Sequence, residues 1–109
     1  MTIREIAPLL ATTGLPVTYG FWPKKQVPAL PYLVWYLPNS SNVAADNAVY
    51  QRIDALNIEL YTPTKSFATE AVVEAALDAA GFVWEKVETY LNSEHMYEVL
   101  YTTEVVING

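Results

Sequence analysis

The sequence lacks cysteine, so disulfide bonds and thiolate metal sites are excluded. It has only four glycines, and none of them forms part of a glycine-rich phosphate-binding loop. No apolar run approaches the roughly 18 residues of a membrane-spanning helix. The first residues, Met1 to Glu5, include an acid and no long apolar stretch, which argues against a secretory signal. We therefore expect a protein of the cytosol, or of a particle assembled there, with no membrane contact.

Basic residues are also scarce. Six Lys and Arg face twelve Asp and Glu, for a net charge of −6. A nucleic-acid-binding surface needs clustered Lys and Arg, so this balance argues against one. Residues 1–65 hold five bases and four acids, whereas residues 66–109 hold one base and eight acids. The two halves can therefore expose surfaces of different sign, although acids often do no more than solvate a surface.

Candidate catalytic residues are few. The single histidine, His95, lies beside Glu94 in an expected hairpin loop, and neighbouring loop residues do not point at a common atom. The acids Asp46, Asp54 and Glu59 show no metal-loop spacing, and no pair of carboxylates is singled out for hydrolysis. The sequence therefore predicts no enzyme, no bound metal and no cofactor.

At 109 residues and 52% apolar composition, the chain predicts one domain spanning 1–109. Thr2 and Glu5 have the spacing of a capping box, but Pro8 conflicts with a regular helix from that point. The helix either kinks at Pro8 or begins nearer Glu5, and Gly14 is a plausible stop. Prolines bracket two extended segments, 17–22 and 32–37, with an irregular loop at 23–31 that exposes Lys24 and Lys25.

Residues 38–47 have the composition of a loop, and alternating apolar residues predict a strand over 49–61, whose first part leaves the core or carries a bulge. Ser66 and Gly81 bracket a helix over 67–80, whose apolar side we expect to include Phe67 and Val72. Segments 82–91 and 96–107 read as strands joined by a hairpin loop. The order predicts an α+β fold: a mostly antiparallel sheet with two helices packed on one face, the other face partly bare.

The aromatic strand 32–37 is apolar on both faces, since Tyr32 and Tyr36 share one face while Leu33 and Trp35 share the other. One interpretation is a central strand buried on both sides. In the other, a second chain covers the tyrosine face, because Tyr and Trp are enriched at interfaces.

Three acids recur every four residues along the 67–80 helix: Glu70, Glu74 and Asp78. This stripe is a solvated face, lines an acidic channel, or meets cations of a neighbouring copy, for which the candidates are Lys24, Lys25 and Arg52.

Taken in order, several segments resemble the small tail terminator (tail completion) proteins of long-tailed bacteriophages and prophages. The resemblance is carried by Gly14 to Tyr19, Leu30 to Tyr36, Asp46-Asn47, Ile58 to Lys65, the helix through Leu77 to Gly81, and Tyr90 to Tyr97. It spans most of the chain, but no single motif carries chemistry. The position of Pro8 departs from what the family leads us to expect.

The resemblance implies a structural protein of the virion tail, assembled in the bacterial cytoplasm. Such subunits form a ring, expected to be hexameric, which caps the tail tube protein, stops its polymerisation and offers a surface to the head-tail connector protein. DNA would pass through without specific binding, and an acidic bore would repel it. Residues 38–47, with Asp46 and Asn47, and residues 23–31 are candidate contacts, as are Tyr32, Tyr36 and Arg52.

Two other functions fit the same sequence. A head-tail connector or stopper protein has a similar size and also forms rings. A monomeric ligand-binding α+β module would instead use the aromatic strand to line a buried small-molecule pocket.

Overall fold

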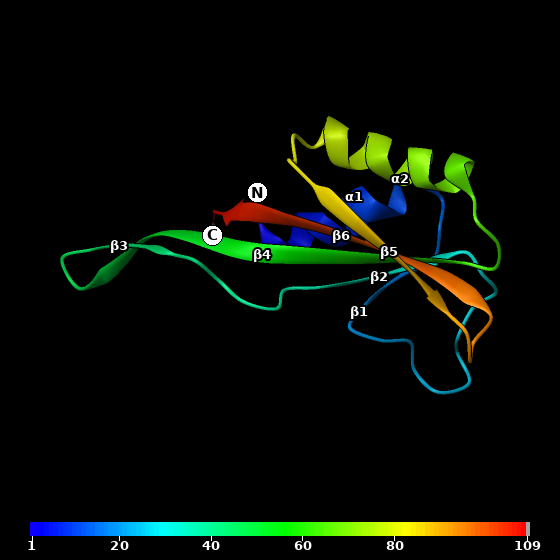
Figure 1. Ribbon diagram of the computed structural model, residues 1–109. Coiled ribbons are helices and arrows are strands. Elements are labelled where there is room, and N and C mark those ends of the chain that lie inside the picture. The colour runs from blue at the N-terminus through cyan, green and yellow to red at the C-terminus, as the bar shows by residue number, and fades with distance from the viewer. Residues whose placement is uncertain (109) are drawn as a thin grey trace.

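The computed structural model describes residues 1–108 and has the expected α+β architecture (Figure 1). The strands form one six-stranded sheet with the order β1-β2-β4-β6-β5, and β3 pairs with β4 outside this path. Only β1 and β2 are parallel. The elements, in chain order, are a 3-10 turn (Ile3–Glu5), α1 (Ile6–Ala11), β1 (Val17–Tyr19), β2 (Tyr32–Tyr36), β3 (Val43–Ala45), β4 (Ala48–Thr62), α2 (Phe67–Ala79), β5 (Glu85–Leu91) and β6 (Met96–Ile107).

One face of the sheet forms the core. Period-two alternation places Leu56, Ile58 and Leu60 of β4 on this face, in register with alternate residues of β2 and β6. Ile6 and Leu10 of α1 and Val73 and Leu77 of α2 pack on them, so both helices cover the same face, as predicted. Burying each large aliphatic side chain contributes about 2 kcal/mol.

The first helix begins late, which settles the conflict at Pro8. A 3-10 turn precedes α1, and Pro8 is the third residue of α1, where a backbone N–H has no acceptor within the helix. Of the two alternatives, the start near Glu5 is therefore correct. The expected capping box is not formed, because the Thr2 side chain makes no capping hydrogen bond.

The second helix has the ends that its sequence predicts. The Ser66 hydroxyl accepts a hydrogen bond from the Thr69 backbone N–H at 3.2 Å, and Gly81 adopts a left-handed φ of +78° just after the last turn.

The expectation that residues 38–47 are only a loop is wrong. Val43–Ala45 forms β3, which pairs with the start of β4 across a tight turn at Asp46-Asn47. Both turn residues have positive φ, 52° and 63°, as a type I′ hairpin requires. A register shift follows Val43, so the bulge expected in the first part of the long strand is present.

Two predicted strands are shorter than expected. The first extended segment ends at Tyr19, because Gly20 turns the chain with a φ of +77°. Strand β5 begins at Glu85 rather than at Phe82, and the Val83 carbonyl instead accepts a hydrogen bond from Thr103 Oγ1 at 2.8 Å. The hairpin between β5 and β6 forms as predicted.

Candidate functional site

Two of the three acids of the α2 stripe, Glu70 and Glu74, face their own sheet. The Glu70 side chain is only 4% exposed, and its carboxylate lies 2.6 Å from Lys65 Nζ and 3.2 Å from Lys86 Nζ. Glu74 lies 2.8 Å from Lys86 Nζ and accepts a hydrogen bond from Tyr101 Oη at 2.7 Å. Glu70 is therefore neither exposed to solvent nor available to line a channel. Its carboxylate is neutralised by two lysines from flanking segments of the same chain.

Asp78, the third acid of the stripe, is exposed, and its carboxylate accepts a hydrogen bond from Trp84 Nε1 at 2.8 Å. The Trp84 ring packs edge-on against Tyr101, with the ring centroids 5.4 Å apart. Asp78 thus orients an aromatic side chain that helps to cover the core.

This ionic cluster shifts several protonation equilibria. Hydrogen bonds from Lys65 to Glu70 and Glu88, and from Lys86 to Glu74 and Glu70, raise the pKa of both lysines. Burial, with the adjacent Glu74 carboxylate, raises the pKa of Tyr101 well above its usual range. All three groups hold their protons more tightly in the folded chain.

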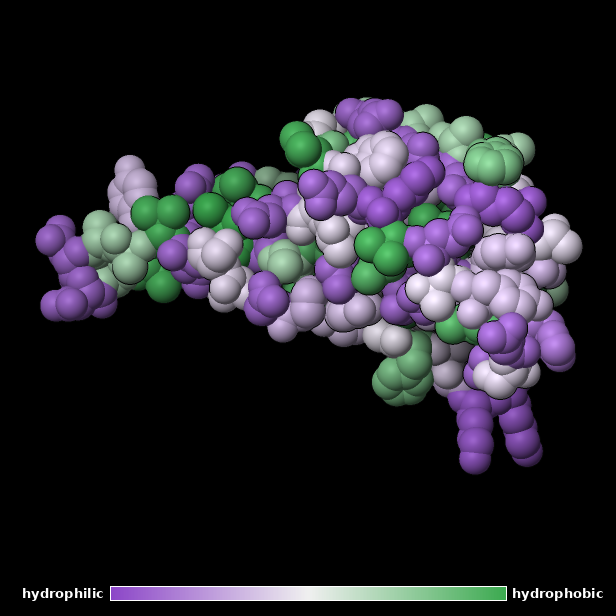
Figure 2. Space-filling view, in the orientation of Figure 1, coloured by the Kyte–Doolittle hydropathy of each residue, from purple (hydrophilic) through white to green (hydrophobic). Residues whose placement is uncertain are grey.

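With Glu70 and Glu74 turned toward the sheet, α2 presents a largely apolar outer face to solvent. Phe67 is 76% exposed, and Val72 is also exposed, contrary to the expectation that both pack on the core. Small residues complete this face: Ala68, Ala71, Ala75 and Ala79. Figure 2 shows pale green atoms along the top of the molecule, where α2 lies. A surface helix usually turns such residues inward, so this face has the character of a contact surface.

The β3–β4 hairpin forms an arm that projects from the sheet (Figures 1 and 2). We define the arm as Pro38–Arg52, because every residue in this range is exposed. The predicted contact residues Asp46 and Asn47 form its tip, and Arg52 lies at its base, 3.6 Å from Asp54. Its large apolar side chains, all exposed, are Val43, Val49 and Tyr50.

An isolated two-stranded hairpin is marginally stable in water. Hydrogen bonds between Asn39 and Ala55 and between Ser41 and Ile53 anchor the base of the arm, but within residues 1–108 its outer part has only its own strand pairing. Nothing in the described chain covers its valines or Tyr50, which is 80% exposed. The exposed apolar side chains give the arm, like the outer face of α2, the character of a contact surface.

The aromatic strand β2 is covered on both faces by its own chain. Leu33 and Trp35 belong to the core, and on the other face Val34 is buried. Trp22, from the β1–β2 loop, packs edge-on against Tyr32 with ring centroids 5.6 Å apart. Burial on both sides thus describes the centre of the strand, whereas Tyr32 and Tyr36 are half-buried and remain candidate contacts. Tyr36, half-buried, accepts a hydrogen bond from Asn57 Nδ2 at 3.2 Å.

The rest of this second face is open and acidic. Tyr61 donates a hydrogen bond to Glu98 at 3.1 Å, and Glu59 lies on the same face two residues before Tyr61. Burial raises the pKa of Glu59, and the Glu98 carboxylate adds to that shift. Burial also raises the pKa of Tyr61, well above its usual range. The open face predicted from the sequence is thus present, and it combines these acids with exposed apolar residues, Val87 and Val106.

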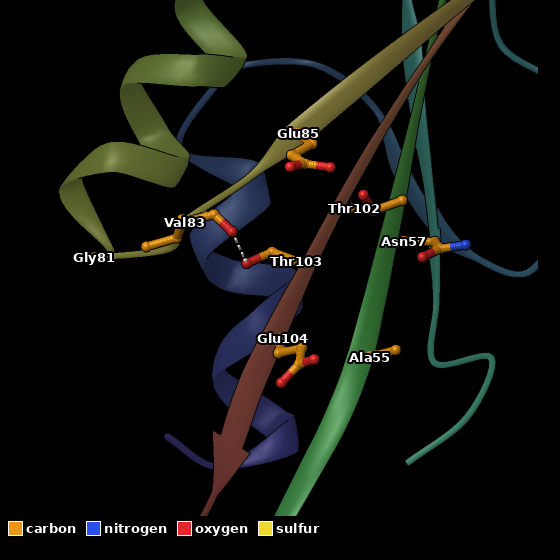
Figure 3. Close-up of a pocket in the computed structure, with 8 residues that line it drawn as sticks. All are labelled: Ala55, Asn57, Gly81, Val83, Glu85, Thr102, Thr103 and Glu104. Carbon is orange, nitrogen blue, oxygen red and sulfur yellow. Dashed lines mark hydrogen bonds between the residues drawn. The ribbon is translucent and has the colours of Figure 1, made fainter. Parts of the chain in front are cut away.

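A groove of about 560 Å³ lies near the β5 edge of the sheet (Figure 3). Glu85 enters it from β5, and Glu104 enters it from β6. Glu85 pairs in register with Thr102, and Glu104 is two residues further along β6, so both carboxylates lie on the same face. The other lining residues are Ala55, Asn57, Gly81, Val83, Thr102 and Thr103.

The aromatic strand β2 contributes nothing to this groove, but Tyr32 and Val34 of β2 line a smaller hollow of about 230 Å³, together with Trp22 and Tyr61. Within residues 1–108, no three His, Asp or Glu side chains are grouped so that they could hold a metal ion. Neither helix in this part of the chain is long and apolar enough to cross a membrane.

The sequence matches no model of a protein family, and a search of curated proteins gives no significant match. The fold is similar to that of a chain in a solved structure described as the virion of a native gene transfer agent particle. The likeness covers 98% of this chain and 89% of that chain, with a TM-score of 0.66 and 17% sequence identity. At this identity the comparison establishes a shared fold across nearly the whole chain.

Proposed function

We propose that this protein is a structural component of a phage-like virion and acts as its tail terminator, a ring that caps the tail tube. The observation that carries the proposal is the likeness of nearly the whole fold to a chain from a gene transfer agent virion. The order of sequence segments that resembles tail terminators supports the same function independently.

The exposed surfaces support self-assembly. The arm and the outer face of α2 are both apolar, and they lie at different ends of the molecule (Figure 1). Two different patches that meet head to tail generate a closed ring when the rotation between copies closes. The proposal therefore includes a homo-oligomer, expected to be hexameric, that contacts the tube protein on one side and the connector on the other.

The proposed role is non-catalytic and lets DNA pass. Glu59 and Glu98 on the open sheet face have no Lys or Arg partner among residues 1–108. If the part of this face around Glu59 and Glu98 turns toward the bore, these two acids repel phosphates as DNA moves through. This assignment replaces Glu70, Glu74 and Asp78 as the candidate bore acids, because those side chains are engaged within the chain.

The proposal is tested by measuring mass against concentration by sedimentation, with and without purified tail tubes, and by imaging the tubes. A terminator gives rings in solution or density at one tube end, and tails without it grow overlong. Heads that leak DNA when the chain is missing would instead indicate a stopper, and a monomer that binds no tube would refute both.

A variant of the arm tests whether its exposed apolar side chains are needed for assembly. Replacing Val49 and Tyr50 with serine removes apolar area that contributes nothing to the core, so the monomer folds and assembly is lost. His95→Asn is the matched control, because it changes another exposed tip whose positive φ asparagine tolerates.

A further inference from the structure

Among residues 1–108, the lysines of the β1–β2 loop have no acidic partner. Arg52, Lys65 and Lys86 each form an ion pair with a carboxylate, whereas no residue within 1–108 forms one with Lys24 or Lys25. Both lysines are exposed at the tip of the loop.

The loop backbone and its flanking residues present these two charges. The Gln26 N–H donates to the Pro23 carbonyl at 3.0 Å, closing a turn in which Lys25 has a φ of 67°. Phe21 and Val27, on either side, are exposed apolar residues. We call this segment, residues 21–27, the basic loop. It combines two free cations with apolar area, as interface segments do.

The groove at the β5 edge carries negative charge that is unpaired within the described residues, opposite in sign to that of the basic loop. No Lys or Arg in the described chain pairs with Glu85 or Glu104, and neither carboxylate accepts a side-chain hydrogen bond there. Val83, at the rim, is 89% exposed, so the groove also offers apolar contact. The acids of α2, which the sequence suggested as partners for Lys24 and Lys25, are already neutralised or hydrogen-bonded within the chain.

The two surfaces lie toward opposite edges of the sheet. The basic loop joins β1 to β2 at one edge, and the groove lies against β5 and β6 at the other. A single chain therefore cannot bring them together, but two copies placed side by side can. Because each copy carries −6, contacts between unpaired cations and carboxylates would offset the repulsion between copies.

We propose that the basic loop of one copy docks into the groove of the next, with the Lys24 and Lys25 ammonium groups beside Glu85 and Glu104. Phe21 and Val27 then pack near Val83 at the rim. This inference rests on the homo-oligomer of the proposed function and adds a charged contact between copies to the apolar contacts of the arm and α2. The contact is heterologous, so repeating it around an axis closes a ring.

The test uses two charge-reversed proteins. One carries Lys24→Glu with Lys25→Glu, so that its loop and its groove are both acidic. The other carries Glu85→Lys with Glu104→Lys, so that both are basic. Each alone should need at least about tenfold more protein for half-assembly, because like charges then meet at every contact. An equimolar mixture should assemble as the wild type does, because every acidic loop can enter a basic groove and every basic loop an acidic one.

Arg4→Glu and Glu94→Lys are the control variants, since both change exposed charges away from the two surfaces and should leave assembly unchanged. Circular dichroism and urea midpoints show that every variant folds. If the wild type assembles and the variants assemble equally well, or fail without rescue by mixing, this docking is refuted while the ring stands. If the wild type assembles neither alone nor on tube ends, the ring and the docking both fail.

Discussion

Replacing the buried carboxylate of Glu70 should strongly destabilise the fold. Its side chain is 4% exposed and touches two lysine Nζ atoms, at 2.6 and 3.2 Å. Glu70→Gln keeps the shape but leaves Lys65 and Lys86 facing a neutral amide. Removing one partner of a buried ion pair costs about 3–5 kcal/mol, but both lysines are partly exposed and keep Glu88 and Glu74, so we expect about 2–3 kcal/mol.

Urea unfolding at pH 7, followed by circular dichroism below the assembly concentration, measures this loss. With a typical slope for a small domain, the midpoint should fall by about 1 to 2 M. Glu88→Gln is the matched control, because Glu88 also pairs with Lys65 but its side chain is 44% exposed. Glu88→Gln should lower the free energy of unfolding by less than about 1 kcal/mol, and this loss should vanish in high salt. The loss caused by Glu70→Gln should persist in high salt, because Glu70 is buried.

The two variants together decide the role of Glu70. If Glu70→Gln unfolds within about 0.5 kcal/mol of the wild type, as ordinary surface substitutions do, the carboxylate contributes nothing that an amide does not and the reasoning is wrong. If both variants lose equal stability, burial is irrelevant and only proximity to Lys65 matters.

Three further outcomes are expected. Tyr61, Tyr101 and Lys86 have higher pKa values in the folded chain than in the unfolded chain, where these values are about 10. Their protonated forms therefore stabilise the fold fully below about pH 10, and this contribution is lost as the pH rises from the unfolded toward the folded pKa values. Urea midpoints should therefore hold from pH 7 to 9 and fall above about pH 10. Asn47→Gly should relieve the φ of 63° and slow amide exchange in the arm, with the global midpoint unchanged. Ser66→Ala removes the cap of α2 and should cost about 1 kcal/mol in urea unfolding.

The sequence predicts the elements whose signals are local. Alternation along β4 and β6 gives the core face, and Ser66 and Gly81 give the ends of α2. The arm also had a local signal: Asp46-Asn47 joins two short apolar segments, and both residue types tolerate positive φ. The Pro, Asn and Ser residues at 38–42 have the composition of a loop, so the sequence did not predict the hairpin.

The orientation of α2 could not be predicted in this way. The helix is apolar around most of its circumference, so periodicity does not choose between burying Phe67 and Val72 or burying Glu70. The choice depends on Lys65 and Lys86, which the fold brings beside Glu70 from 5 and 16 residues away. The contact with Lys86 depends on how β5 is placed in the sheet, which no pattern along the chain specifies.

The use of the few cations links stability to assembly. Lys65 and Lys86 satisfy the carboxylates that α2 turns inward, and Arg52 pairs with Asp54 at the base of the arm. Three of the six bases thus form ion pairs within the chain, whereas Lys24 and Lys25 lie together on one loop, unpaired among residues 1–108. Since a chain of charge −6 repels its own copies, these lysines are the charges best placed to offset that repulsion. Added salt screens both the attraction between the lysines and carboxylates and the general repulsion between acidic copies. Assembly should therefore weaken with salt only if the lysine contacts outweigh the repulsion. Sedimentation at 50 and 500 mM NaCl separates the two, and stronger assembly at high salt would mean that apolar contacts of the arm and α2 hold the copies together.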